Sequence, residues 1–279
     1  MGGGSGAEQG RVAFVLGGGG ILGATQVGML RALFEAGVRP DLVVGTSVGA
    51  LNGALVASDP SVSSIERLTD LWTSLSDSEV FSGGLISRAR TLARNGTHLH
   101  SSAPLRSLLA AALPARFEDL AVPFQCVAAE IERATARWFD RGPLVEAVLA
   151  SCAVPGLLPP VRIGDASYLD GGLVHSIPVG RAIGLGAATV YVLHVGRVEQ
   201  PLHPPRRPWQ VGLVAFEIAR RHRFVEEMAA VPEGTRVVVL RSGMDETPLV
   251  SLRYRDTRRV ATRIDSAYRA SREALAAAG

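Results

Sequence analysis

The chain has 279 residues, 47% hydrophobic and 20% charged, so it can form one large α/β domain with a sizeable aliphatic core. Its net charge of +3, with arginine as its only basic residue besides histidine, gives no reason to infer a nucleic-acid partner. Two cysteines, Cys126 and Cys152, are too few for a disulfide framework, and they indicate reduced core residues in a cytoplasmic protein.

The chain is expected to hold one domain over residues 11–279. Residues 1–10 are Gly-rich and polar and have no basic segment followed by an apolar one, so they predict a flexible tail rather than a secretory signal. No run of about 18 apolar residues occurs, which predicts that any membrane contact is peripheral.

The first 57 residues predict a βαβ unit with parallel strands. Val12–Leu16 is a short apolar run that ends in four glycines, as a buried strand before a tight loop does. Ala24–Glu35 has apolar residues at helical spacing, Leu42–Val44 is a second buried strand, and Ser47–Ala57 is a second helix.

The rest of the chain continues to alternate between helical and strand patterns. The predicted elements are a mainly helical stretch at 59–120, strands at 124–131, 134–139, 161–163, 167–169, 188–195 and 237–240, and helices at 144–151 and 252–278. This pattern predicts a three-layer α/β/α sandwich around a mostly parallel central sheet.

A serine stands where the second predicted strand ends and a helix begins, in Gly45-Thr46-Ser47-Val48-Gly49. In a nucleophile elbow the serine occupies a sharp, strained turn, and small neighbours let the backbone pass closely. The positive end of the helix dipole favours developing negative charge at that place. The alternative is an ordinary turn in which Ser47 only caps the helix.

A glycine-rich loop, Gly17–Gly20 followed by Ile21-Leu22-Gly23, connects the first strand to the first helix. Its N–H groups could hold the phosphates of a nucleotide or the oxyanion of an acyl-transfer reaction. A nucleotide site favours an acidic residue at the end of the second strand, where this chain has Ser47 instead. Adjacent parallel strands would place the loop beside Ser47, which favours the oxyanion hole.

An aspartate follows a later strand, in Tyr168-Leu169-Asp170-Gly171-Gly172. A partly desolvated carboxylate at the edge of the sheet can accept a serine proton, because burial raises its pKa. The alternative is a turn aspartate that only accepts a hydrogen bond from its own backbone.

In this order, the three features resemble those of the patatin-like phospholipases, and the stretch Ala150–Gly156 with Pro159-Pro160-Val161 adds to the likeness. The resemblance implies a serine acyl-hydrolase that cleaves lipid esters without a metal, a cofactor or a catalytic histidine. It makes Ser47 the nucleophile and Asp170 the base. The implied oxyanion-hole glycines are Gly18, Gly19 and Gly20, and the remaining motif glycines are Gly23, Gly45, Gly49, Gly171 and Gly172.

The glycine loop departs from the family pattern at one position, because Leu22 stands where the family usually has Arg or Lys. Leucine cannot hold the loop or add positive potential through its side chain, although the backbone donors are unaffected. The departure keeps open a different acyl substrate or a lipid-binding pseudoenzyme. An α/β nucleotide-binding protein that uses the glycine loop is a further alternative.

A Ser-His-Asp triad is the rival mechanism, since His175, His194, His203 and His222 all follow Asp170 in the chain. His175 is nearest in sequence and could line the site.

A basic amphipathic stretch runs from Arg206 to Phe224 and includes Trp209 and Leu213. Such a helix either lies on an anionic lipid surface or packs its apolar face on its own domain. The apolar run Val211–Ala215 is also a candidate homodimer contact.

Overall fold

The computed structural model of this chain describes residues 10–77, 98–195, 201–206, 208–243 and 258–278. Within these ranges eight strands form one sheet in the order β5-β6-β3-β2-β1-β7-β8, and β4 also pairs with β3. The strands are β1 (Val12–Leu16), β2 (Leu42–Thr46), β3 (Phe124–Glu130), β4 (Thr135–Phe139), β5 (Val161–Ile163), β6 (Ala166–Asp170), β7 (Thr189–Leu193) and β8 (Arg236–Leu240).

The main part of the sheet is parallel, as predicted. Strands β3, β2, β1, β7 and β8 pair in parallel, whereas β4, β5 and β6 form an antiparallel extension at one side. Leu16 at the end of β1 pairs with Gly45 of β2. The loops that follow these two strands therefore start side by side at the carboxyl edge of the sheet, where α/β proteins place their sites.

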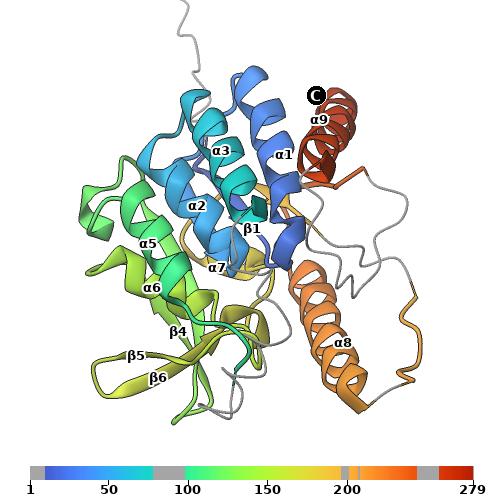
Figure 1. Cartoon of the computed structure of the whole chain (residues 1–279). Helices are drawn as coiled ribbons and strands as arrows, with labels where there is room; N and C mark the ends of the chain where they lie inside the picture. The colour runs from blue at the N-terminus through green and yellow to red at the C-terminus, as the bar shows by residue number, and fades with distance from the viewer. Residues whose placement is uncertain (1–9, 78–97, 196–200, 207, 244–257, 279) are drawn as a thin grey trace, which may run out of the picture.

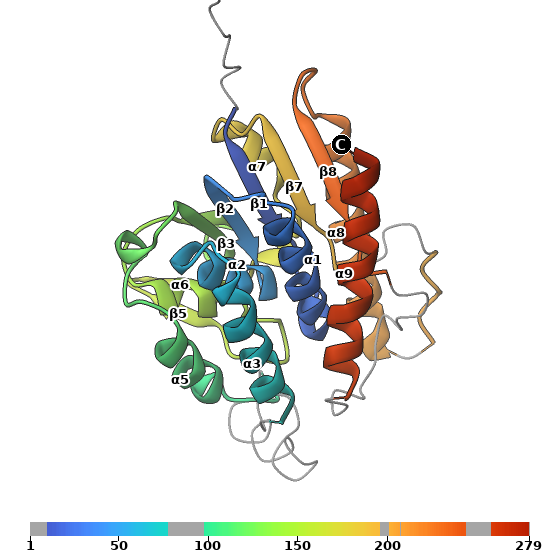
Figure 2. The ribbon, with the colours of Figure 1, turned by 90° about the horizontal axis from the view of Figure 1, so that it is seen from above.

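Helices cover both faces of the sheet, which confirms the predicted α/β/α architecture (Figures 1 and 2). One face packs against α1 (Ala24–Glu35), α2 (Val48–Ser58), α3 (Ser63–Asp77), α5 (Ala103–Ala112), α6 (Leu144–Ser151) and α9 (Arg258–Ala278). The other face packs against α7 (Val179–Gly184) and α8 (Pro208–Ala229). Three short 3-10 helices are η1 (Gly20–Gly23), η2 (Phe117–Asp119) and η3 (Gly171–Leu173).

The central strand β1 shows why an uninterrupted apolar run was needed. Phe14 and Leu16 point into the cluster beneath α1 and α2, whereas Ala13 and Val15 point into the cluster beneath α7. All four side chains are fully buried. A strand buried on both faces needs apolar residues at every position, because successive side chains alternate between the faces.

The structure differs from the sequence prediction in several elements. The stretch 59–120 forms α3, α5 and η2, and its residues 78–97 lie outside the described ranges, as do 1–9 of the predicted tail and 252–257 of the predicted last helix. Helix α7 was not predicted, because six residues with two glycines are too few to show helical spacing. Cys126 and Cys152 are free and buried, as expected for core thiols.

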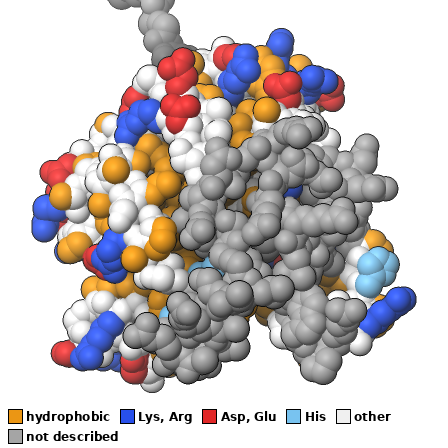
Figure 3. All heavy atoms as spheres, viewed as in Figure 1, with side chains coloured by type: hydrophobic (Ala, Val, Ile, Leu, Met, Phe, Trp, Pro, Cys, Tyr) orange, Lys and Arg blue, Asp and Glu red, His pale blue; other side chains and the backbone are white. Residues whose placement is uncertain are grey.

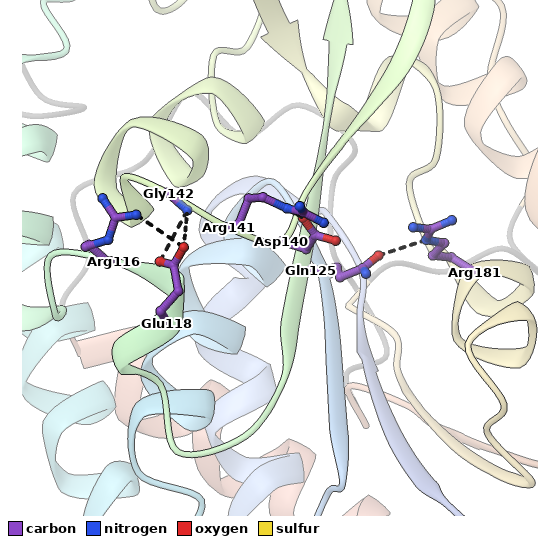
Figure 4. Close-up of polar contacts among 7 residues, drawn as sticks. All are labelled: Arg116, Glu118, Gln125, Asp140, Arg141, Gly142 and Arg181. Atoms are coloured by element: carbon purple, nitrogen blue, oxygen red, sulfur yellow. Dashed lines mark hydrogen bonds and ion pairs between the residues drawn. The ribbon is translucent and has the colours of Figure 1, made fainter.

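Polar side chains fasten the antiparallel extension and α7 to the sheet (Figure 4). Arg181 Nε of α7 donates to Gln125 Oε1 of β3 at 2.8 Å, and the guanidinium also lies 4.9 Å from the ring centroid of Trp138. Glu118 of η2 accepts from the backbone N–H of Gly142, at 3.1 Å for its nearer oxygen. The first two contacts join α7 to strands β3 and β4, and the third joins η2 to the loop after β4.

The described part of the chain has charges of both signs on one face and no helix that could span a bilayer (Figure 3). On the described portion of the face in Figure 3, arginine side chains are interspersed with acidic ones. Among the described helices, none combines the length and the apolar character needed to cross a bilayer.

Candidate active site

Ser47 occupies a strained turn between β2 and α2. Its φ of 56° and ψ of −126° are unusual for a residue with a side chain, and such conformations cost about 1–3 kcal/mol. The two motif glycines around it are required by close approach. A Cβ atom on Gly49 would lie 2.1 Å from the Leu16 carbonyl oxygen, and one on Gly45 would lie 2.4 Å from the Gly49 oxygen. The backbone therefore has the form of a nucleophile elbow.

The structure brings Ser47 and Asp170 together from positions 123 residues apart. Ser47 Oγ donates to Asp170 Oδ2 at 2.6 Å, and the residues are only 6% and 2% exposed. Asp170 ends β6, and its Oδ1 accepts from the Gly172 N–H at 2.7 Å. Asp170 thus makes both the turn contact and the serine contact that the sequence offered as alternatives.

Burial makes Asp170 a stronger base than an ordinary carboxylate. Desolvation raises its pKa from 3.8 to about 6, against the hydrogen bonds from Ser47 and Gly172 and the positive charge of Arg220, which lower it. At pH 7 such a group is still mostly ionised, yet its pKa is close enough to neutrality for proton transfer to and from a substrate.

Ser151 accepts a hydrogen bond from the Ser47 backbone, a role that the sequence analysis did not assign. The Ser47 N–H donates to Ser151 Oγ at 2.9 Å, and Ser151 is fully buried at the end of α6. The stretch Ala150–Gly156 was noticed in the sequence as part of a family likeness. Nothing in that stretch alone indicated that its serine accepts from a backbone amide on another element.

We expect Ser151→Ala to lower kcat for ester hydrolysis about tenfold and to destabilise the fold by about 1–3 kcal/mol, because it leaves the buried Ser47 N–H without its acceptor. Steady-state kinetics and thermal unfolding would measure both effects. Ser271→Ala is the matched control, since Ser271 is equally buried and its hydroxyl has no hydrogen-bond partner among the described residues. Equal behaviour of the two variants would contradict the role of Ser151.

A buried polar network holds the two ends of the glycine loop. Gln26 Nε2 donates to the Gly17 carbonyl at 2.9 Å, and Asn52 Nδ2 donates to the Gly23 carbonyl at 2.9 Å. Asn52 also donates to Gln26 Oε1 at 2.8 Å and accepts from Trp72 Nε1 at 2.9 Å. The sequence did not single out Gln26 for this network, because α1 also carries Thr25, Arg31 and Glu35.

The middle of the loop lies against Ser47. A Cβ atom on Gly18 would be 3.2 Å from Ser47 Cβ, and the Gly18 N–H donates to the Ser176 carbonyl at 2.9 Å. The segment after Asp170 is also fixed to the elbow, because Thr46 Oγ1 donates to the His175 carbonyl at 2.7 Å. The predicted glycine loop, serine turn and aspartate turn therefore form one connected site.

Of the four histidines of the rival triad, His203 is exposed and the other three contact other groups. His175 Nδ1 lies 3.0 Å from Glu227 Oε1, and its ring packs on Trp138. His194 is buried with its ring stacked on Phe224, and His222 is exposed with its Nδ1 3.3 Å from Glu226. The partner that the structure gives to the Ser47 hydroxyl is Asp170.

Comparison with known proteins identifies the family of the chain. A family model described as Patatin-like phospholipase matches residues 14–183, more than half of the chain, and it includes the glycine loop, the serine turn and the aspartate turn. The chain belongs to the patatin-like phospholipase family. The resemblance seen in the sequence is thereby confirmed.

Two curated relatives show the extent of the match. "Patatin-like phospholipase domain-containing protein 7" of Rattus norvegicus is 34% identical over 187 residues, which cover 66% of this chain and 14% of the relative. "Lysophospholipase nte1" of Aspergillus terreus is 31% identical over 196 residues, which cover 67% of this chain and 12% of the relative. The patatin-like match thus spans about one seventh or less of these longer proteins.

A solved structure supports the fold independently. VipD from Legionella pneumophila superposes with a TM-score of 0.51 at 14% sequence identity, covering 96% of this chain and 67% of that one. At this identity the likeness concerns the patatin-like fold alone.

Proposed function

We propose that this chain is a serine acyl-hydrolase that cleaves carboxylic esters of lipids through a Ser47–Asp170 dyad. The observation that carries the proposal is the 2.6 Å hydrogen bond between a buried carboxylate and a serine in a strained elbow. Family membership and the lysophospholipase relative support a lipid ester as the substrate class.

In the proposed mechanism Asp170 accepts the Ser47 hydroxyl proton as Oγ attacks the ester carbonyl carbon. The tetrahedral intermediate collapses, the C–O bond to the alcohol breaks, and Asp170 returns its proton to the departing alcohol. Asp170 then deprotonates a water molecule that attacks the acyl-serine. When that intermediate collapses, the acid leaves and the proton returns to Ser47 Oγ, so the enzyme is restored.

The proposed oxyanion donors are the N–H groups of Gly19 and Gly20, at the start of η1. Gly18 contributes its close approach to Ser47, while its own N–H is engaged by the Ser176 carbonyl. One such donor lowers the barrier by about 2.7–4 kcal/mol. The amino-terminal end of α2 adds a favourable dipole beside the developing charge.

Fluorophosphonate labelling, combined with fatty-acid release from lysophospholipid, diacyl phospholipid and triacylglycerol, tests this function. We expect labelling at Ser47 and turnover of at least one of the three lipids. Saturable vesicle binding without labelling or turnover would instead indicate the lipid-binding pseudoenzyme. Saturable ATP or NAD binding without labelling would favour the nucleotide-binding alternative.

We propose that the outer face of α8 is the peripheral membrane contact. Val211, Ile218 and Val225 are 54%, 54% and 57% exposed and lie seven residues apart, so they share one side of the helix. The opposite side carries Phe216 and Arg220, which touch the candidate active site. A lipid surface bound there would lie one helix diameter, about 10–12 Å, from the candidate site. The side chains of Trp209 and Leu213 lie outside the described residues.

We expect an Ile218→Glu, Val225→Glu double variant to bind phosphatidylglycerol-containing vesicles at least about a hundredfold more weakly, because burying each apolar side chain stabilises binding by about 1.5–3 kcal/mol. Co-sedimentation measures this, with Val62→Glu as the control, since Val62 is similarly exposed on a different part of the molecule. Unchanged binding of the double variant contradicts the proposal. Loss of a dimer by light scattering, without vesicle binding, would assign the face to a second copy.

A further inference from the structure

Arg220 of α8 reaches the glycine loop from a point 202 residues further along the chain. Its Nη1 donates to the Gly18 carbonyl at 3.0 Å and lies 3.4 Å from Ser176 Oγ. Nε and Nη2 donate to the two oxygens of Glu217 at 2.9 and 2.8 Å. The Arg220 side chain is only 9% exposed. This two-pronged pairing with a carboxylate fixes the plane of the guanidinium and therefore the direction of the bond to Gly18.

The hydrogen bond from Arg220 to the Gly18 carbonyl fixes the orientation of the Gly18–Gly19 peptide. The Gly18 carbonyl and the Gly19 N–H belong to the same planar trans peptide, so they point in opposite directions. Glycines on both sides would allow this peptide to rotate at little cost. With the carbonyl held by Arg220, the Gly19 N–H is kept on the opposite side, away from the guanidinium. Arg220 thus fixes the orientation of a proposed oxyanion donor without touching the oxyanion.

The loop cannot supply this contact itself. Residues 17–23 carry no charged side chain, and Leu22 stands where a cation was expected from the family pattern. Leu22 contributes through its backbone, whose N–H donates to the Gly19 carbonyl at 3.3 Å and whose carbonyl accepts from Thr25 Oγ1 at 2.7 Å. The positive charge beside the loop comes from α8.

The same helix also touches the aspartate turn. A Cβ atom on Gly172 would lie 2.9 Å from the Phe216 ring, so Phe216 and Arg220, one turn apart on α8, contact the aspartate turn and the glycine loop. The charge of Arg220 lowers the pKa of Asp170, against the larger effect of desolvation, and so keeps more of the carboxylate ionised.

We propose that Arg220 is a positioning residue that holds the Gly18–Gly19 peptide in its oxyanion-binding orientation and replaces, from α8, the cation missing at Leu22. The inference rests on the proposed acyl-hydrolase function. Arg220 has two separable effects: the forked hydrogen bonds orient the peptide, and the positive charge favours ionised Asp170.

Two substitutions separate these effects. With a soluble p-nitrophenyl ester, Arg220→Gln should lower kcat about 10–100-fold, leave KM within about twofold, and shift the acid limb of the pH profile upward. Arg220→Lys should lower kcat to a similar degree while its acid limb stays near that of wild type, because the charge remains and the fork is lost. Arg223→Gln is the control and should stay within about twofold of wild type, since Arg223 is an exposed arginine on the same helix.

Thermal unfolding and Ser47 labelling by fluorophosphonate accompany the kinetics. If Arg220→Gln does not fold, Arg220→Lys and Glu217→Gln decide the matter, since Glu217→Gln weakens the anchor of Arg220 and should also lower kcat. Folded variants at Arg220 whose kcat equals that of wild type would overturn the inference and leave the dyad intact. A wild-type protein without turnover or labelling would instead overturn the proposed function.

Discussion

Replacing Ser47 with alanine is expected to lower kcat for ester hydrolysis on the order of 10⁴-fold or more and to abolish fluorophosphonate labelling. The reason is that the substitution removes Oγ, the atom that forms the acyl intermediate, and no other group in the dyad can take its place. Mass spectrometry of the labelled protein and hydrolysis of a soluble ester measure the two effects. Retained labelling at wild-type stoichiometry in Ser47→Ala would show that another residue is the nucleophile.

Ser47→Gly is the matched control for folding. Both variants lack the hydroxyl, but only glycine adopts a φ near 56° without a Cβ clash. We therefore expect Ser47→Gly to be more stable than Ser47→Ala by about 1 kcal/mol, with both inactive. Equal thermal stabilities of the two would show that the elbow stores no backbone strain.

The second large effect is expected for Asp170→Asn, which should lower kcat for ester hydrolysis about 10²–10⁴-fold. Asparagine can still accept the hydrogen bond from the Gly172 N–H, so the turn should persist, but it cannot take the proton from Ser47. Asp165→Asn, in the exposed turn before β6, is the control and should match wild type. Wild-type turnover by Asp170→Asn would exclude this carboxylate as the base.

The pH dependence follows from the raised pKa of Asp170, about 6. The base must be ionised, so kcat/KM should be half-maximal near pH 6 and fall about tenfold per unit below it, and this limb should vanish in Asp170→Asn.

The stability of the fold has the opposite pH dependence. Because the folded pKa exceeds the ordinary 3.8, protonation favours the folded state, and this stabilisation is present below pH 4 and lost as the pH rises through 6.

Asp170→Asn should accordingly be more stable than wild type at pH 8 by about 3 kcal/mol, and the difference should shrink towards pH 4. Chemical denaturation at the two pH values measures it. A wild-type protein that is more stable than Asp170→Asn at pH 8 by a similar amount would contradict the cost assigned to burying this charge.

Local sequence patterns were sufficient to predict the two strands and the two loops that position the candidate site. The apolar runs Val12–Leu16 and Leu42–Val44 each form a strand, although the second extends to Thr46. The predicted neighbours, the glycine loop and Ser47, do lie together, because β1 and β2 pair in parallel. The long stretch 59–120 was less well predicted, since helices with similar amphipathic spacing leave their boundaries undefined in a sequence.

The supporting contacts could not be predicted in the same way. Ser151, Gln26 and Asn52 are ordinary polar residues in apolar helices, and each acquires its role from a backbone atom on another element. Arg220 was seen in the sequence only as part of a basic amphipathic stretch. Its contact with Gly18 depends on how α8 packs against the rest of the domain. The two residues are 202 positions apart, and the spacing of residue types along the chain cannot predict such a contact.

The sequence by itself determined the strained serine turn, the glycine loop and the aspartate turn, because each depends on residue types within a few positions: glycines where the backbone passes closely, and a serine where a strand meets a helix. Only the tertiary structure decided that Ser47 and Asp170 share a hydrogen bond, that burial raises the pKa of that carboxyl, and that the cation at the glycine loop comes from α8. Burial and long-range hydrogen bonds arise only when distant segments pack together. Their energies therefore cannot be predicted from any local segment of the sequence.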